Sequence, residues 1–414
     1  MADNSVKPHV LIIGAGIGGL VLAQCLRKQN VPCTVFEKDD GPTARPSGWA
    51  IGIHTILDEF ESSMPNDMPP FEESVSHLPP LNLKVQIGIY LKFGRQVVES
   101  TPEHRIVRAN RLRLRNWLLN QIPVQWGKRL TRVVEGFGEG IQVQFEDGTK
   151  ATGDILVGAD GVNSIWTSAI REYLLQRPNK DTLKTVPATM IIGETILSGE
   201  CFERQLSLGH SCYVKSAVDT SYFLFVGLSE VSPDGTSGQY YWYVTQKDEN
   251  AGKDDHWLRS ASQTEKLEHA LKSTSPLDPK FTEIIRETPT SGILQHHMIF
   301  RDIEIDELPT GRITLLGDAA HAMSPFRGEG GVHAIRDALN LAKALGRLDL
   351  NKSGEINSSL GLYQDEMLQR GAAAVRKSRN AQKANSGGGG ETMVWGRTPV
   401  EAPEENILLK GCLV

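Results

Sequence analysis

The chain has 414 residues, of which 39% are hydrophobic and 23% charged, and its formal net charge is −6. This length predicts two or three packed units, and the negative charge argues against a nucleic-acid binder, which needs a basic face. No apolar run approaches the ~20 residues that span a bilayer, and the N-terminus lacks a signal-peptide pattern. Five cysteines without metal-ligand or redox spacing favour a reduced cytoplasmic setting and predict no metal site.

The first forty residues have the pattern of a βαβ unit. Residues 9–13 form an apolar run, residues 17–28 carry apolar side chains at helical spacing, and residues 31–37 read as a second strand. Strand, glycine turn, helix and strand in this order predict a parallel sheet.

The turn of this unit contains Gly14, Gly16 and Gly19, which supply a G-x-G-x-x-G pattern. The first glycine permits the tight turn, the second lets a pyrophosphate approach the backbone, and the third lets helix and strand pack closely. Glu37 ends the second strand, where an acidic residue holds an unphosphorylated ribose, as in FAD or NAD. The pattern therefore predicts a dinucleotide site.

The middle of the chain predicts more strands and connections. Residues 61–82 favour a loop-dominated connection, residues 104–119 a helix with one basic face, and residues 136–140 a hairpin turn, so one nucleotide fold is expected. Strands are expected at residues 141–146 and 154–158. From residue 186 to 245 the alternating aromatic pattern favours a sheet that walls a flat aromatic substrate, although the same aromatic side chains would equally form its core.

The last third of the chain contains a strand, a turn and a helix. Residues 313–317 form an apolar strand, and Asp318 follows it, where its carboxylate can accept hydrogen bonds from a polyol. A loop rich in proline and glycine then permits close approach to a planar ring, and residues 332–348 predict a helix. The tail from residue 384 is expected to be loosely draped and without function of its own.

Taken together, these motifs resemble those of the class A flavoprotein monooxygenases, the family of para-hydroxybenzoate hydroxylase and its fungal secondary-metabolite relatives. Three separated motifs carry the resemblance. They are the glycine loop with Glu37 and Lys38, the stretch Gly158-Ala159-Asp160-Gly161, and the stretch Gly317-Asp318-Ala319-Ala320-His321 with its proline and glycines. Their order and spacing match the family across residues 9–346.

The resemblance implies FAD and NAD(P)H as cofactors. It implies that Asp160 lies near the pyrophosphate, that Asp318 bonds the ribityl chain, and that backbone around Pro325 and Gly330 steers oxygen transfer. It also implies that Arg45 and Arg111 contact the cofactor. The complete set of cofactor residues expected is Gly14, Gly16, Gly19, Glu37, Lys38, Arg45, Arg111, Asp160, Asp318, Gly328, Gly330, Gly331 and Val332, and the expected catalytic set is Pro325, Gly330 and Arg45.

Two positions depart from the family pattern. Thr167 stands where the family usually has arginine, and Val332 stands where it usually has asparagine. These losses of side-chain donors leave open a flavin oxidase, a dehydrogenase or a cyclase on the same scaffold, or a non-catalytic FAD-binding protein. His321 is a candidate for proton transfer, but the structural interpretation, packing beside the turn, is favoured.

The sequence thus predicts an α/β fold, with a Rossmann-type FAD-binding domain, an inserted β-sheet substrate domain and a C-terminal helical segment. The FAD-binding domain is expected over residues 1–75, 103–180 and 291–350, the substrate domain over 76–102 and 181–290, and the C-terminal helix and tail over 351–414. The expected function is monooxygenation of an aromatic or polycyclic small molecule with O2. Hydroxylation, epoxidation and Baeyer–Villiger insertion stay open, as does the oligomeric state.

Overall fold

The computed structural model describes residues 6–44, 48–91, 94–137, 140–162, 169–216, 222–352, 354–384 and 397–403, together with residues 405, 407 and 409. A parallel sheet lies at the centre of one half of the molecule. In spatial order the strands are β18 (Ile313–Leu315), β11 (Ile155–Gly158), β1 (Val10–Ile13), β2 (Cys33–Phe36) and β7 (Val124–Gln125). The three central strands, β11, β1 and β2, consist mainly of apolar residues, because helices cover one face of the sheet and a second sheet covers the other.

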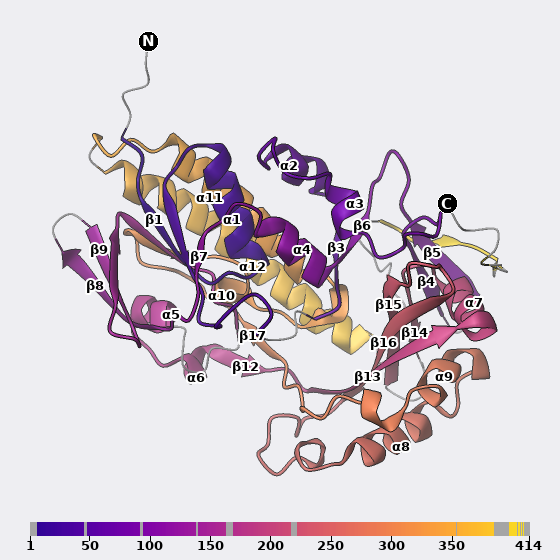
Figure 1. The fold of residues 1–414 in the computed structure, drawn as a ribbon. Coiled ribbons are helices and arrows are strands. Elements are labelled where there is room, and N and C mark those ends of the chain that lie inside the picture. Colours follow the sequence, from indigo (N-terminus) through magenta and orange to yellow (C-terminus); the bar gives the residue numbers. More distant parts are fainter. Residues whose placement is uncertain are drawn as a thin grey trace.

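Helices pack against one face of the parallel sheet. In Figure 1, α1 (Ile17–Lys28), α11 (Gly330–Arg347) and the long α12 (Glu355–Ala384) lie side by side, with α4 (Arg111–Leu118) next to α1. On the other side lies an antiparallel sheet of β8 (Leu130–Phe137), β9 (Gly140–Phe145) and β10 (Lys150–Gly153). The β8–β9 hairpin, in which Phe137 pairs with Gly140, agrees with the turn predicted at residues 136–140, although residues 138 and 139 lie outside the described residues.

A seven-stranded sheet forms the second half of the molecule. Its order is β13 (Ala188–Ser198), β16 (Ser237–Lys247), β15 (Tyr222–Val231), β14 (Cys212–Ser216), β4 (Gln86–Tyr90), β5 (Arg95–Glu99) and β19 (Val400–Glu401). Figure 1 shows this sheet at the lower right, with α7 (Gly199–Leu208), α8 (Gln263–Thr274) and α9 (Pro279–Arg286) against it. Two small two-stranded sheets, β3 (Ala50–Ile53) with β6 (Val107–Asn110) and β12 (Leu183–Thr185) with β17 (Arg301–Ile303), join the halves.

The aromatic residues of the large sheet divide between its two faces. Tyr240 and Trp242 are buried under the helices, in the same apolar core as Tyr213 and Phe202. Because successive side chains of a strand point to opposite faces, Tyr241 faces the other way. Both interpretations of this aromatic segment, sheet core and cavity wall, therefore hold, each for alternate residues.

The remaining elements are short. They are the α-helices α2 (Leu57–Ser62), α3 (Phe71–Val75), α5 (Ala169–Leu175), α6 (Asn179–Thr182) and α10 (Asp318–His321), and the 3-10 helices η1 (Trp257–Arg259), η2 (Thr290–Gly292) and η3 (Pro325–Arg327). No helix in the part of the chain that the structure describes has the length and apolar character to cross a bilayer.

Several local predictions need correction. The helix predicted over residues 104–119 begins only at Arg111, because residues 107–110 pair with β3 and the Asn110 side chain caps the helix by accepting from the Arg113 amide at 3.1 Å. The predicted sheet over 186–245 is interrupted by α7. The segment 61–82 is loop-dominated as predicted, with the end of α2 and the five residues of α3 as its helical parts.

The C-terminal tail also differs from its prediction. Val400 and Glu401 pair with β5 as an added strand, and Ile407 and Leu409 are buried in the core of the large sheet. Ile407 and Leu409 are therefore packed rather than loosely draped, because an apolar surface of the large sheet accepts them, whereas Val400 and Glu401 pair with β5 but stay exposed. The exact domain boundaries stay a prediction.

Candidate active site

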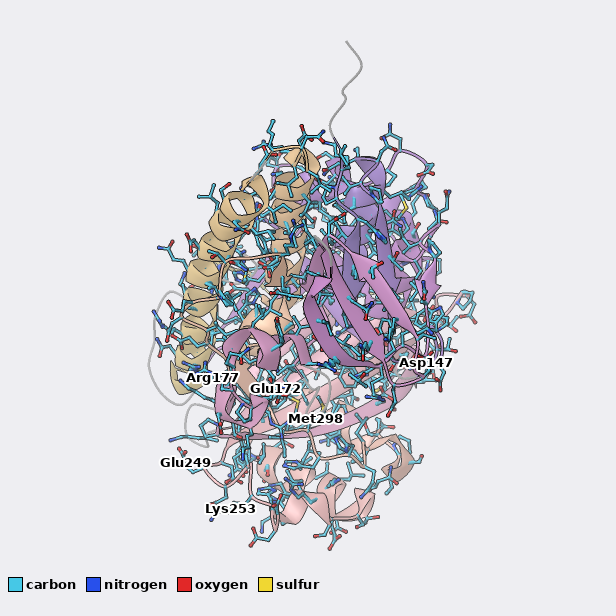
Figure 2. All side chains as sticks on the ribbon, turned by 90° about the vertical axis from the view of Figure 1, so that its left-hand side faces the viewer. Asp147, Glu172, Arg177, Glu249, Lys253 and Met298 are labelled. Carbon is cyan, nitrogen blue, oxygen red and sulfur yellow. The ribbon has the colours of Figure 1, made fainter. Side chains whose placement is uncertain are left out.

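One cavity of about 1740 Å³ connects the two halves of the molecule. Its lining includes residues from all three glycine-rich motifs and from the face of the large sheet that carries Tyr241. Met298 also lines it, and in Figure 2 this residue lies at the level where the upper and lower halves meet. Motifs that are distant in sequence thus border one space.

The first motif forms a tight turn between β1 and α1. Gly14 has a φ of +116°, and a Cβ on it would lie 2.4 Å from the carbonyl oxygen of Ala159. Gly16 precedes α1, and a Cβ there would meet nothing within 4 Å, so its surface is open. Gly19 does not line the cavity; a Cβ on it would lie 2.1 Å from the Gly14 carbonyl oxygen, which explains the close packing of helix on strand.

Glu37 holds the end of β2 against this turn. Its Oε2 accepts a hydrogen bond from the amide of Ala15 at 2.8 Å, its Oε1 accepts from the amide of Asp39 at 3.2 Å, and the side chain is buried. Glu37 and Lys38 both border the cavity, 22 and 23 positions after Ala15 in the chain. The acidic residue is therefore placed at the glycine loop, as the sequence predicts.

The second motif follows β11 and faces the same turn. Asp160 lines the cavity, and among the described residues no hydrogen-bond partner reaches its buried Oδ2. Burial raises the pKa of Asp160 from its ordinary value of 3.8 to about 7, although the Arg171 guanidinium opposes the rise. Gly161 takes a φ of +78° directly after it. An unpartnered buried oxygen at this place leaves capacity for a ligand.

Thr167 lies outside the described residues, but the structure provides a buried arginine close by. Arg171, on α5, is fully buried and donates from Nε to Asn179 Oδ1 and from Nη1 to the carbonyl oxygen of Ala319, each at 2.8 Å. The helix that follows the second motif is thus tied to the turn of the third motif by a guanidinium. Sequence reasoning missed this residue; the signal available was an arginine on the apolar face of a short helix, four positions after Thr167.

The third motif supplies a further part of the cavity lining, next to the glycine loop. Asp318 begins α10 with its exposed side chain on the cavity, directly after Gly317, whose φ is +60°. The cavity lining continues through Pro325, at the start of η3, and Gly328, Gly330 and Gly331. A Cβ on Gly331 would lie 2.8 Å from the Ile51 side chain, so close packing requires this glycine.

His321 is a structural residue. Its Nε2 lies 2.7 Å from Oδ2 of Asp337, whose same oxygen accepts from the amide of Gly317 at 2.7 Å, and Arg370 donates to the other oxygen at 2.6 Å. His321 is 2% exposed and does not line the cavity. This buried network holds the turn of the third motif, in agreement with the structural interpretation of His321.

The other predicted residues divide three ways. Arg111, the first residue of α4, lines the cavity, and a Cβ on Gly48 would lie 3.4 Å from its side chain. Val332 lies in the apolar core and does not line the cavity, so in this structure it is a packing residue. Arg45 lies outside the described residues. Arg115, buried on α4, donates from Nε to the Ala15 carbonyl at 3.1 Å and braces the glycine loop.

The large sheet contributes a polar cluster that sequence reasoning did not identify. Trp49 stacks on Tyr241, with ring centroids 4.7 Å apart, and its Nε1 donates to Oε1 of Glu194 at 2.5 Å. Arg108 is buried and donates from Nη2 to the Tyr241 hydroxyl at 2.9 Å. All four residues line the cavity. The alternation of residues along a strand could not have identified Trp49, because this residue is not part of the sheet on which it packs.

The C-terminal segment completes the lining with Thr398 and Pro399. Arg95, buried on β5, donates from Nη1 to the Pro403 carbonyl at 2.5 Å, and Arg397 donates to the Glu99 carbonyl at 2.6 Å. The tail predicted to lack function therefore borders the site.

Comparisons with known proteins agree with this arrangement. A family model described as an FAD-binding domain matches residues 118–378, and one described as an NAD(P)-binding Rossmann-like domain matches residues 12–57. The FAD-dependent monooxygenase thnD of Trichoderma harzianum is 47% identical over 387 residues, which cover 91% of this chain and 94% of that protein. The chain belongs to the FAD-dependent monooxygenases. The monooxygenase cctM of Talaromyces islandicus is 28% identical over 383 residues, 89% of this chain and 91% of that protein.

Two solved structures show the fold of this monooxygenase. The 2,6-dihydroxypyridine-3-hydroxylase of Arthrobacter nicotinovorans has a TM-score of 0.71 at 17% identity, over 98% of this chain and 100% of that chain. Klebsiella pneumoniae HpxO, solved with FAD and uric acid, has a TM-score of 0.69 at 21% identity, over 92% of this chain and 89% of that chain. The predicted α/β fold with a Rossmann-type region and a sheet domain is confirmed.

The residues around the cavity fit FAD. The open backbone at Gly16 leaves room for a pyrophosphate, and the exposed Asp318 carboxylate can accept hydrogen bonds from ribityl hydroxyls. The buried Oδ2 of Asp160, which has no partner among the described residues, can bind a donor. The individual contacts of the predicted site residues with FAD stay predictions.

Proposed function

We propose that this monooxygenase uses NADH or NADPH and O2 to insert one oxygen atom into an aromatic or polycyclic small molecule, an intermediate of secondary metabolism. The observation that carries the proposal is the single cavity, which runs from the glycine loop to the aromatic face of the large sheet. The fungal relatives named FAD-dependent monooxygenases support the reaction class. The flat aromatic surfaces of Phe225, Tyr241 and Tyr243 support the substrate class.

The chain's own residues would hold and orient the reactants. Bound FAD would supply the reducing electrons for O2 and the atom at which oxygen is activated. Asp318 would accept hydrogen bonds from hydroxyl groups of the ribityl chain, and the backbone at Pro325 and Gly330 would lie against the ring. The N-terminus of the 18-residue α11 provides a positive dipole end beside this loop, which favours negative charge on a reduced ring.

Exclusion of water from the reacting atoms would come from the apolar part of the cavity. Met190 and Ile192 on β13, and Phe223 and Phe225 on β15, line the substrate side, and Met323 borders the cavity beside Gly330. A water-poor cavity limits wasteful loss of activated oxygen. The proposed site therefore combines a polar cofactor half with an apolar substrate half.

Two measurements test this function. Purified protein should show a flavin absorbance band that bleaches when NADH or NADPH is added without oxygen. With labelled O2 and a mixture of hydroxylated polycyclic aromatics, one labelled atom should enter the product. Flavin reduction without label in any product would support an oxidase, dehydrogenase or cyclase instead, and bound flavin that neither nicotinamide reduces would reject the proposed reductant.

A further inference from the structure

We propose that Glu194 binds a hydroxyl donor on a flat aromatic substrate, and that Trp49 holds the carboxylate in place for this contact. The inference rests on the proposed function, since it concerns the substrate side of the same cavity. It names the substrate class more closely: a planar aromatic with a phenolic hydroxyl, rather than an aromatic hydrocarbon or its ether.

Glu194 lies on the face of the large sheet that lines the cavity. Residues Met190, Ile192 and Glu194 alternate along β13 and all line the cavity, so Glu194 is the charged member of an otherwise apolar row. In the register of β13 and β16, Glu194 stands directly opposite Tyr241. Directly opposed residues lie about 5 Å apart between their Cβ atoms. The carboxylate is therefore next to the aromatic surface that would hold a flat substrate.

One carboxylate oxygen of Glu194 accepts a hydrogen bond within the protein. Oε1 accepts from the Trp49 indole at 2.5 Å, and the same indole stacks on Tyr241 at an interplanar angle of 11°. Within the residues that the structure describes, Oε2 accepts no hydrogen bond and the carboxylate has no ion-pair partner within 4 Å. A carboxylate oxygen can accept further hydrogen bonds, and it cannot donate. Glu194 thus offers an acceptor to whatever occupies the cavity.

The surroundings explain why a donor would be required there. The neighbouring Tyr241 hydroxyl already accepts from Arg108, which is buried and held by the carbonyl of Leu228. A half-buried carboxylate in an apolar slot loses hydration when a substrate enters, and this loss is offset only by a donor on that substrate. A phenolic hydroxyl supplies the donor, whereas a methyl ether does not.

A second carboxylate on the cavity provides a matched control. Glu230 also borders the cavity, but its charge is paired with the Arg113 guanidinium, whereas Glu194 has no ion-pair partner among the described residues. Glu194→Gln is the informative variant. Its amide oxygen can keep the Trp49 hydrogen bond, and its NH2 group then replaces Oε2 and donates instead of accepting.

The experiment measures binding of naphthol and methoxynaphthalene to the FAD-loaded protein by fluorescence titration, with no nicotinamide present. The unchanged protein should bind naphthol about tenfold more tightly than the ether, as expected for one hydrogen bond to a charged group. In Glu194→Gln the preference should fall to within twofold, with the affinity for methoxynaphthalene little changed. In Glu230→Gln the tenfold preference should remain.

Three results would overturn the inference: binding of neither probe, equal affinity of the unchanged protein for both, or a preference that survives Glu194→Gln. Trp49→Phe gives a second readout, because it keeps an aromatic ring on Tyr241 but removes the indole N–H. It should reduce the preference partly, since the acceptor remains but is less well oriented. None of these measurements involves turnover, so a failure here is distinct from a failure of flavin reduction or of oxygen incorporation.

Discussion

The guanidinium of Arg171 donates to the carbonyl oxygen of Ala319 at 2.8 Å, across 148 positions of the chain. This contact joins the helix after the second motif to the turn of the third motif. Nε of the same side chain donates to Asn179 Oδ1, also at 2.8 Å, and its charge acts on Asp160. One buried side chain therefore links α5, which follows the second motif, to the turn that carries Asp318.

Replacement of Arg171 by methionine should destabilise the protein by about 3 kcal/mol, because two buried acceptors lose their donor. FAD should also bind more weakly, since the turn that carries Asp318 is no longer tied to α5. Arg171→Lys keeps a charge but not the planar donor geometry, so its stability and its affinity for FAD should lie between those of the unchanged protein and those of the methionine variant. Urea unfolding and titration with FAD measure both effects; a methionine variant as stable as the unchanged protein would show that the two contacts do not contribute.

The stability of the FAD-free protein should depend on pH through Asp160. Its pKa is about 7 in the folded chain, raised by burial from the ordinary 3.8, so between these values the folded state holds a proton that the unfolded state has lost. Stability attributable to this group therefore falls as the pH rises from about 4 to about 7. The Asp160→Asn variant lacks this titration. As the pH rises across this window, its free energy of unfolding should increase by a few kcal/mol relative to that of the unchanged protein, about 1.4 kcal/mol per unit of pKa shift. The two proteins should be compared by denaturant unfolding at pH 5 and pH 8. If the difference between their free energies of unfolding were the same at both pH values, the prediction would be wrong.

Gly14 and Gly16 should respond differently to the same substitution. Gly14→Ala places a Cβ 2.4 Å from the Ala159 carbonyl oxygen, at a φ of +116°, so both the fold and FAD binding should suffer. Gly16→Ala meets nothing within 4 Å in the protein itself. It should therefore fold with nearly unchanged thermal stability but retain FAD at least tenfold more weakly, because the methyl group would occupy space needed by the pyrophosphate.

Thermal unfolding and flavin content after gel filtration measure this pair. Full retention of FAD in Gly16→Ala would remove the backbone at Gly16 from the pyrophosphate site.

The C-terminal segment should contribute to stability. A chain that ends after residue 396 exposes the edge of β5 and leaves Arg95 without the Pro403 carbonyl. It also loses the buried side chains of Ile407 and Leu409, each of which stabilises by about 2 kcal/mol. Denaturant unfolding should show a loss of about 3 kcal/mol or more, and Ile407→Ala alone should reproduce a part of it. A truncated chain of unchanged stability would mean that this segment does not hold to the sheet in solution.

Much of the cofactor half could be predicted from the sequence. The glycine loop, Glu37, Asp160 and Asp318 each follow an apolar strand, and a short strand–turn pattern records the local backbone that a dinucleotide needs. The expected alternation in the aromatic segment was also readable, because strand periodicity is written in consecutive residues. The family and the α/β fold follow from these local patterns and their order.

The tertiary structure decided what depends on segments remote from each other. It placed Arg171 beside the third motif, the Trp49 indole within hydrogen-bond distance of Glu194, and the tail on the edge of β5. It also assigned Tyr241 to the cavity and Trp242 to the core. Neighbours along a chain share a local conformation, so their pattern reveals it. A contact between distant residues depends instead on strand register and on how packed layers meet, and no short stretch of sequence contains that information.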